Sequence, residues 1–198
     1  NSPSQPAILN IGPYKDQMIH GDVTHGGIKR VFIDEVDGVK QGAVFRFIQG
    51  LDAGINRTVW GPDGNLYAGG VGSGGNWRHE GRLWYALHRF KYNEKSTFEM
   101  LAVRAKGNGM EIEFTEPIAN DALVDIDAFE VEQFYYEATE DYGGPKLGLE
   151  RLKIKSIQLA GDRKKIFLEI DGIEENRVVY IHITKPLKDE KNRSLWST

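Results

Sequence analysis

The sequence predicts an all-β protein with two successive domains, and three observations lead to this class. Short runs rich in β-branched and aromatic residues recur roughly every ten residues, with glycine-rich turns between many of them. No segment has the apolar spacing of a helix of about three turns. A polar stretch, Lys91–Ser96, separates a glycine-rich first half from a second half with fewer glycines and more Glu and Lys, so we place the domain boundary between residues 94 and 95.

The first domain, residues 1–94, is predicted to be a β-meander. Its clearest signal is Pro62-Asp63-Gly64, which lies between the β-prone Ile55–Trp60 and the apolar Leu66-Tyr67. Proline fixes φ, aspartate bonds back to its own backbone and glycine accepts a positive φ, so the triplet makes a tight turn between strands. This arrangement is typical of β-propeller blades. The expected strands are Ile28–Ile33, Ala43–Ile48, Asn56–Trp60, Asn65–Ala68 and Arg82–Lys91.

The length of the chain limits the propeller interpretation. A complete propeller needs about four to eight blades of roughly 40–50 residues each, whereas the whole sequence has 198 residues. We therefore expect the first domain to be the last blades of a partial propeller, and the chain to be the C-terminal portion of a longer protein. Because a truncated propeller exposes unpaired strand edges, the remaining blades or a second copy are the expected partners.

The second domain, residues 95–198, is predicted to be an immunoglobulin-like β-sandwich of two sheets. Alternating residues such as Ile112 and Phe114 are expected to face the core, and Asp162-Arg163 and Asp171-Gly172 supply turns. Several strands within about a hundred residues fit that class. The expected strands are Phe98–Ala105, Gly109–Phe114, Val131–Ala138, Leu152–Leu159, Lys165–Ile170 and Val178–Ile183.

The composition excludes several classes of function. The chain has no cysteine, which removes disulfides, thiolate catalysis and Cys-ligated zinc. Its formal net charge of −4 provides no field that would favour nucleic acid, so we expect no nucleic-acid partner. No apolar run approaches the roughly 20 residues of a transmembrane helix, so no transmembrane segment is expected.

Three strings carry a family resemblance: His20–Phe32 (HGDVTHGGIKRVF), Gln41–Phe47 (QGAVFRF) and Arg57–Tyr67 (RTVWGPDGNLY). Through them, residues 20–92 resemble the last part of the propeller in bacterial quinoprotein sugar dehydrogenases, the glucose/sorbosone dehydrogenase-like family, and look most like large secreted proteins of Bacteroidetes type. The resemblance implies a periplasmic or extracellular location and a parent protein that uses pyrroloquinoline quinone (PQQ) with Ca²⁺. It implies no catalytic residue here, because the blades that carry the general-base His and the Ca²⁺ ligands lie outside this chain.

Arg57 is the cofactor-binding residue that the resemblance assigns. It matches the second Arg of the family's Arg-x-Arg, whose guanidinium suits bidentate recognition of the quinone carboxylates. The first Arg of that pair falls on Ile55, and the family's Lys falls near Thr24 or His25. These departures argue against quinone binding, so we assign no cofactor to this chain by itself.

Residues 97–198 are similar to bacterial Ig-like domains. The similarity rests on Met110–Ile118 (MEIEFTEPI), on the strand Arg177–Ile183 and on Lys185–Asp189 (KPLKD). Such domains act as spacers, or as platforms for a neighbouring catalytic domain.

Two groups of residues are candidates for binding. His20, Asp22 and His25 form the pattern H-x-D-x-x-H, which can supply ligands to a divalent metal. The alternative is a turn on a glycine-rich loop in which the His side chains cap backbone groups. The aromatic residues Trp77, Trp84 and Tyr85 can stack against the face of a sugar ring or can belong to a core.

These observations favour a C-terminal fragment of a secreted or periplasmic quinoprotein sugar dehydrogenase-like protein that is inactive alone. Two other functions stay open. One is a β module on the cell surface that binds carbohydrate or protein, and the other is a structural spacer.

Overall fold

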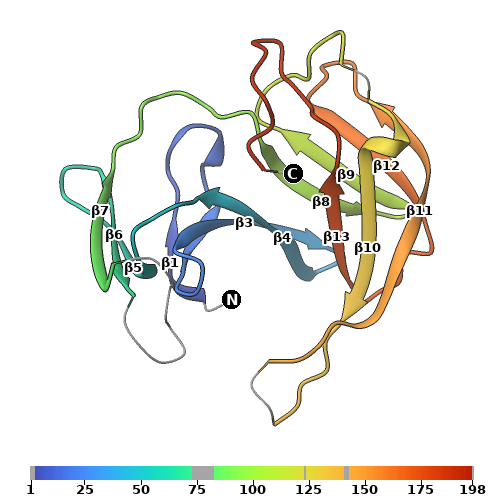
Figure 1. Ribbon diagram of the computed structural model, residues 1–198. Helices are drawn as coiled ribbons and strands as arrows, with labels where there is room; N and C mark the ends of the chain where they lie inside the picture. Colours follow the sequence, from blue (N-terminus) through green and yellow to red (C-terminus); the bar gives the residue numbers. More distant parts are fainter. Residues whose placement is uncertain (1–2, 73–82, 123, 141–142, 198) are drawn as a thin grey trace. The chain divides into compact units, whose positions relative to one another are not determined.

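The computed structural model describes residues 3–72, 83–122, 124–140 and 143–197. Its contacts divide the chain into two compact units, Asn1–Ser96 and Thr97–Thr198. Strands form both units, and the described residues contain no α-helix, only short 3₁₀ turns such as η1 (Gly12–Tyr14) and η3 (Ile126–Ala128) (Figure 1). The prediction of an all-β protein is therefore confirmed. Among the described residues, no helix has the length and apolar character needed to cross a bilayer.

The N-terminal unit begins with a four-stranded antiparallel sheet whose strands pair in chain order. Its strands are β1 (Pro3–Ile8), β2 (Met18–Asp22), β3 (Gly27–Val36) and β4 (Val39–Ile48). Asp37 and Gly38, both at positive φ, close the β3–β4 hairpin. The sequence predicted β3 and β4, but it did not predict β1 or β2. Pro3 and Pro6 remove the strand signal of β1, because proline is disfavoured in strands and is found mainly in edge strands and at bulges. In agreement with this, the β1–β2 register shifts between these two residues.

A three-stranded antiparallel sheet completes this unit, again with its strands paired in chain order. It consists of β5 (Gly54–Trp60), β6 (Leu66–Val71) and β7 (Tyr85–Phe90). The predicted turn joins β5 to β6: Gly64 has φ 74° and its N–H donates to the Gly61 carbonyl at 3.0 Å. The Asp63 carboxylate accepts a hydrogen bond from the Asn65 N–H at 3.1 Å, as a turn aspartate should.

The two sheets of the N-terminal unit approach each other closely where β2 and its following turn meet β5. A Cβ on Gly54 would lie 1.8 Å from the Val23 carbonyl oxygen, and one on Gly21 would lie 2.4 Å from the Ile55 carbonyl oxygen. Only glycine therefore fits at either position. The inner faces that this contact brings together bury Ile19, Ile28 and Ile55 completely, and these side chains form the centre of the core.

A buried arginine closes one end of this core. Arg30 on β3 is fully buried, and its guanidinium carbon lies 4.6 Å from the Phe45 ring centroid and 5.1 Å from that of Tyr14. Its Nη1 donates a hydrogen bond to Gln17 Oε1. The Tyr14 ring packs edge-on against Phe47 at 5.1 Å, so the 3₁₀ turn η1 is held against β3 and β4 by this aromatic cage.

The C-terminal unit contains six strands in the order β13-β10-β11-β12-β9-β8. Their bounds are β8 (Met100–Lys106), β9 (Gly109–Phe114), β10 (Phe129–Tyr135), β11 (Leu147–Leu159), β12 (Lys165–Asp171) and β13 (Val178–Ile183). The long strand β11 changes partner at its middle, since Leu147–Leu152 pairs with β10 and Lys153–Leu159 pairs with β12. The sheet therefore curls into a half-barrel, as Figure 1 shows. The six strands join through β11 into one curled sheet, and the Ig-like type stays a prediction.

The concave side of the curled sheet carries the core of the C-terminal unit. Phe98 and Phe114 pack with ring centroids 5.6 Å apart, and Ile112 is fully buried, as its alternation with Phe114 predicted. The chain after β13 crosses back over this core with Leu187 buried. Asp189 holds that crossing segment in place, because its carboxylate accepts hydrogen bonds from the N–H groups of Lys191 and Arg193 and from the Arg193 guanidinium.

Candidate functional site

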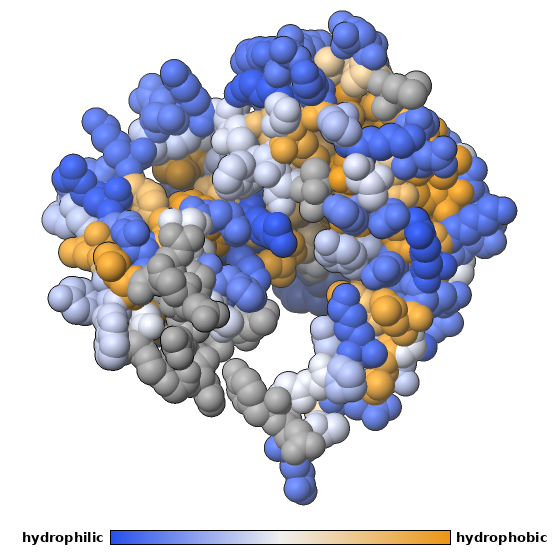
Figure 2. Space-filling view, viewed as in Figure 1, coloured by the Kyte–Doolittle hydropathy of each residue, from blue (hydrophilic) through white to orange (hydrophobic). Residues whose placement is uncertain are grey.

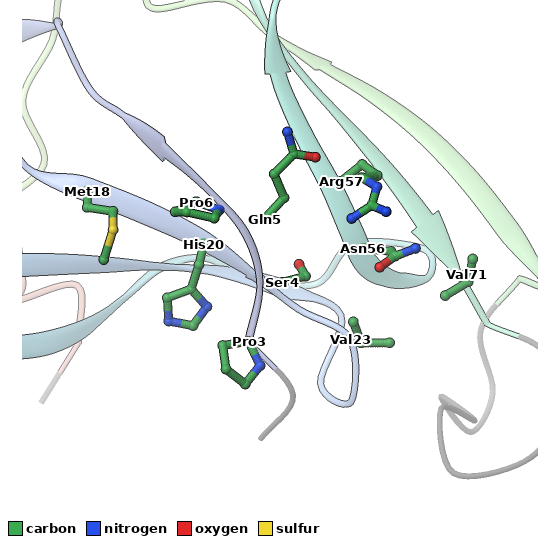
Figure 3. Close-up of a pocket in the computed structure, with 10 residues that line it drawn as sticks. All are labelled: Pro3, Ser4, Gln5, Pro6, Met18, His20, Val23, Asn56, Arg57 and Val71. Atoms are coloured by element: carbon green, nitrogen blue, oxygen red, sulfur yellow. The ribbon is translucent and has the colours of Figure 1, made fainter.

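A pocket of about 800 Å³ lies beside β1 in the N-terminal unit. Figure 3 shows β1 running through its middle, with side chains from β2 on one side and side chains from β5 on the other. The described residues that line the pocket are Pro3, Ser4, Gln5, Pro6, Met18, His20, Val23, Asn56, Arg57 and Val71. The pocket is therefore built where the two sheets of this unit meet.

Side-chain hydrogen bonds hold β1 against β5. Ser4 Oγ donates to the Ile55 carbonyl at 2.7 Å, and the Trp60 indole Nε1–H donates to the Ile8 carbonyl at 2.9 Å. Between them, Thr58 Oγ1 donates to the Gln5 carbonyl at 3.1 Å. Three bonds spaced along the strand fix its position on β5, whereas the other edge of β1 pairs with β2 through the backbone. The walls of the pocket thus depend on one strand that contacts both sheets.

The chemistry of the lining is mixed. His20 Nδ1 lies 2.8 Å from the Gly21 carbonyl oxygen, so the imidazole is held by the backbone of its own strand. On the other side of β1, Asn56 and Arg57 lie side by side and supply an amide and a guanidinium (Figure 3). Apolar contacts come from Met18, the β1 prolines and the valines. Such a site suits a partly apolar ligand that bears an anionic or hydrogen-bonding group.

Two of the residues singled out from the sequence, Arg57 and His20, line this same pocket. Arg57 is exposed on β5, where its guanidinium is accessible to a ligand. Ile55, the position that holds the first Arg of the family pair, is fully buried in the core between the sheets. The pocket therefore offers one guanidinium where the family pattern has two.

The three candidate metal ligands are not gathered into a metal site. Within the described ranges, no group of three or more His, Asp or Glu side chains is placed to hold a metal ion. Asp22 is buried, and its Oδ1 accepts hydrogen bonds from the N–H groups of Thr24 and His25, both at 3.0 Å, while its Oδ2 pairs with Lys29 Nζ at 3.0 Å. The His25 side chain is exposed. The motif therefore forms a turn, as the alternative interpretation expected, but the Asp22 carboxylate caps it instead of the His side chains.

Burial, the largest single effect on Asp22, would raise the pKa of its carboxyl. The hydrogen bond from the His25 N–H and the bond and positive charge of Lys29 outweigh it, and together they lower the pKa from 3.8 to about 2. Asp22 is therefore a charged anchor for the turn between β2 and β3.

The aromatic candidates lie at the start of β7. The side chains of Trp84 and Tyr85 are 70% and 80% exposed, so neither belongs to the core. Trp77 lies outside the described residues. Figure 2 shows apolar side chains at the surface over the β5–β7 sheet, on the left of the view. The exposed aromatic pair therefore belongs to a wider apolar surface of this sheet.

Sequence reasoning did not find the part of the pocket that β1 contributes. Ser4 and Gln5 lie in a polar, proline-containing N-terminal segment that has no strand signal. Asn56 and Met18 were likewise not singled out. Two signals did point to the pocket: the family resemblance assigned Arg57, and the H-x-D-x-x-H pattern included His20.

Comparison of the chain with protein-family models, curated proteins and solved structures returns no significant match.

The Asp22 anchor predicts a specific pH dependence of stability. The folded-state pKa of about 2 is below the unfolded value of 3.8, so its stabilisation is fully present above about pH 4 and is lost as the pH falls towards 2. Asp22→Asn should lower the free energy of unfolding by about 2 kcal/mol at pH 7 and by much less near pH 2. Urea unfolding at the two pH values measures this difference. Asp37→Asn, in the exposed β3–β4 turn, is the control, and a pH-independent loss in Asp22→Asn would contradict the assignment.

Proposed function

We propose that the N-terminal unit is the last part of a larger β-propeller of the glucose/sorbosone dehydrogenase-like kind, within a secreted or periplasmic protein. In this proposal the chain supplies docking faces for the remaining blades and does not catalyse on its own. The observation that carries the proposal is the stack of two consecutive antiparallel meanders whose outer faces both expose apolar side chains. The C-terminal unit is proposed to be an Ig-like spacer or platform.

The outer face of the β1–β4 sheet is apolar along several strands. Ile8, Met18, Val31 and Val44 lie opposite one another across the four strands and so share one face, and Ile33 is on the same face of β3. Ile8, Ile33 and Val44 are exposed, although residues on a solvent-facing sheet surface are normally polar. This face therefore exposes a group of apolar side chains, although Lys29 and Arg46 also lie on it.

The outer face of the β5–β7 sheet has the same character. Val59 lies opposite Tyr67, Leu87 lies opposite Gly69, and Tyr85 lies opposite Val71, so these residues share the face turned away from the β1–β4 sheet. Val59, Tyr85 and Leu87 are exposed. Arg57 and Arg89 also lie on this outer face, beside the apolar side chains. A stack of two sheets that is apolar inside and exposes apolar side chains on both outer faces is suited to packing between further sheets of the same kind. A propeller provides that environment.

The pocket residues do not fit PQQ with Ca²⁺ in this chain alone. Among the described lining residues, Arg57 is the one Lys or Arg, and none is a carboxylate that could ligate Ca²⁺. Buried Ile55 cannot supply a second cation. Any quinone chemistry therefore needs residues from the remaining part of the proposed propeller.

The proposal predicts that the chain alone is not a dehydrogenase. With PQQ, Ca²⁺, a panel of aldose sugars and an artificial electron acceptor, it should give no dye reduction above the protein-free blank. The physical reason is that one guanidinium without carboxylates cannot position the quinone and its cation. Turnover that depends on the chain and is lost in Arg57→Ala would contradict the proposal.

If the outer face of the β5–β7 sheet is a docking face, two leucines of this sheet should differ in how much they contribute to the stability of the isolated chain. Leu87 is 76% exposed on the outer face, whereas Leu66 is 3% exposed on the inner face. Leu66→Ala should lower the free energy of unfolding by about 2–5 kcal/mol, and Leu87→Ala should change it by less than about 0.5 kcal/mol. Urea unfolding of the two variants measures both values. Equal losses would mean that the outer face is already packed within this chain, and the docking proposal would fail.

A second candidate function is carbohydrate binding, which the exposure of Trp84 and Tyr85 favours. The two residues are neighbours in the sequence, and each exposes ring area of the kind that packs against the CH face of a sugar. In this case Trp84→Ala should abolish binding on a glycan array, while Trp196→Ala, which removes a half-exposed tryptophan of the C-terminal unit, should leave it unchanged. Equal binding by wild type and Trp84→Ala would exclude this surface, and absence of any binding by wild type would leave the spacer function.

A further inference from the structure

The strand β13 forms one edge of the curled sheet in the C-terminal unit. It pairs with β10 through six consecutive residue pairs, from Phe129–Ile183 to Phe134–Val178, without a shift in register. Within the part of the chain that the structure describes, no backbone hydrogen bond runs from Val178–Ile183 to a strand on the other side. The outward N–H and C=O groups of β13 therefore form a straight, regular template for another strand.

In the described sheets, the edge strands other than β13 contain prolines, charged residues or register shifts, which discourage pairing with another chain. The strand β13 contains no proline, Lys, Arg, Asp or Glu, and its register is unbroken. Among the six edges of the described sheets, β1 contains two prolines, and β4, β5, β7 and β8 each contain at least one Lys or Arg. The registers beside β1, β5 and β8 are also broken by shifts. The sequence of β13, VVYIHI, contains no Pro, Gly, Lys, Arg, Asp or Glu. Charges, prolines and bulges are the usual means of protecting an edge, so their absence marks β13 as a pairing edge.

The side chains of β13 also leave this edge accessible to a second strand. Val178 and Tyr180 on the convex face are each 47% exposed, whereas Val179 and Ile181 on the concave face are half-buried. Lys146 Nζ lies 5.6 Å from the Tyr180 ring centroid and 4.3 Å from that of Phe134. The Tyr180 ring therefore has a cation–π contact with Lys146 within its own chain. Figure 2 shows apolar side chains at the surface in the region of β10 and β13.

We propose that β13 pairs antiparallel with β13 of a second copy of this chain, about a two-fold axis perpendicular to the sheet and centred on Tyr180. In this register Tyr180 lies opposite its own copy on the convex face. On the concave face, Val179 lies opposite Ile181 of the second copy. The two curled sheets thereby join into one continuous sheet.

A second copy is the occupant that the chemistry of β13 favours. A strand without Lys, Arg, Asp or Glu can meet itself without placing two such charges of the same sign opposite each other, which is the usual obstacle to self-pairing. The two-fold register sets Tyr180 against Tyr180 and Val179 against Ile181, and both aromatic and β-branched cross-strand pairs are favourable. It also sets Val178 against His182, a pair in which like charges do not meet. A charged peptide would gain no ion pair from the side chains of β13 itself. The inference does not depend on the propeller proposal, because it concerns the C-terminal unit alone.

The test uses opposite charges placed at the two-fold axis. Wild type should sediment as a concentration-dependent dimer, and Tyr180→Lys and Tyr180→Glu should each weaken the dimer at least about tenfold, because each places like charges opposite each other. An equimolar mixture of the two variants should dimerise again, since Lys then lies opposite Glu. Loss of folding cannot produce this rescue. Leu149→Lys, which changes an exposed leucine on the internal strand β11, is the matched control and should dimerise like wild type.

Hydrogen–deuterium exchange on the same samples tests whether β13 itself forms the contact. In hydrogen–deuterium exchange, the β13 amides should exchange more slowly as the wild-type concentration rises, and those of Tyr180→Lys should not respond to concentration. A monomeric wild type across the accessible range would overturn the proposal. A wild-type dimer that Tyr180→Lys leaves intact would also overturn it, because the contact would then lie elsewhere.

Discussion

The N-terminal unit depends on the contact between β1 and both of its neighbours. One edge of β1 pairs with β2 through the backbone, and its residues are fixed on β5 by bonds from Ser4, Thr58 and Trp60. Beside it, the glycines Gly21 and Gly54 permit the close approach of β2 and its following turn to β5, because a side chain at either position would collide with a backbone carbonyl. Together with the approach of β2 to β5, the β1 contact lets the two sheets bury their inner faces against each other. The pocket exists because β1 joins them.

The same packing explains which surfaces are available for function. Each of the two sheets packs one face against the other sheet and leaves its second face open to partners. Val44 is exposed on this second face of the β1–β4 sheet, and Leu87 is exposed on that of the β5–β7 sheet. It also places Arg57 at the rim of the pocket while it buries Ile55, two residues before it. The function proposed for this unit is therefore docking, and its ligand chemistry is limited to one guanidinium and neutral polar groups.

Much of the fold could be predicted from the sequence, because β-branched alternation and glycine turns act locally. The turn at Pro62-Asp63-Gly64 and the strands around it followed from these signals, and so did most strands of the second domain. The strand β1 could not be predicted, since its two prolines oppose strand formation and only contacts with β2 and β5 make it a strand. At the site, Arg57 was found from its motif. The pattern of His20, Asp22 and His25 did not reveal that Asp22 would turn inward to Lys29, because spacing alone does not determine the direction of a side chain.

The most direct test of the account is a nuclear Overhauser spectrum of the chain that follows the indole N–H proton of Trp60. The structure places this group 2.9 Å, nitrogen to oxygen, from the Ile8 carbonyl. The account predicts cross-peaks from that proton to backbone protons of Ile8 and Leu9, while the indole proton of exposed Trp84 shows none to β1. If the Trp60 indole proton gave no cross-peak to β1, that strand would not lie on β5. The joined sheets, the pocket and the docking faces would then all be wrong.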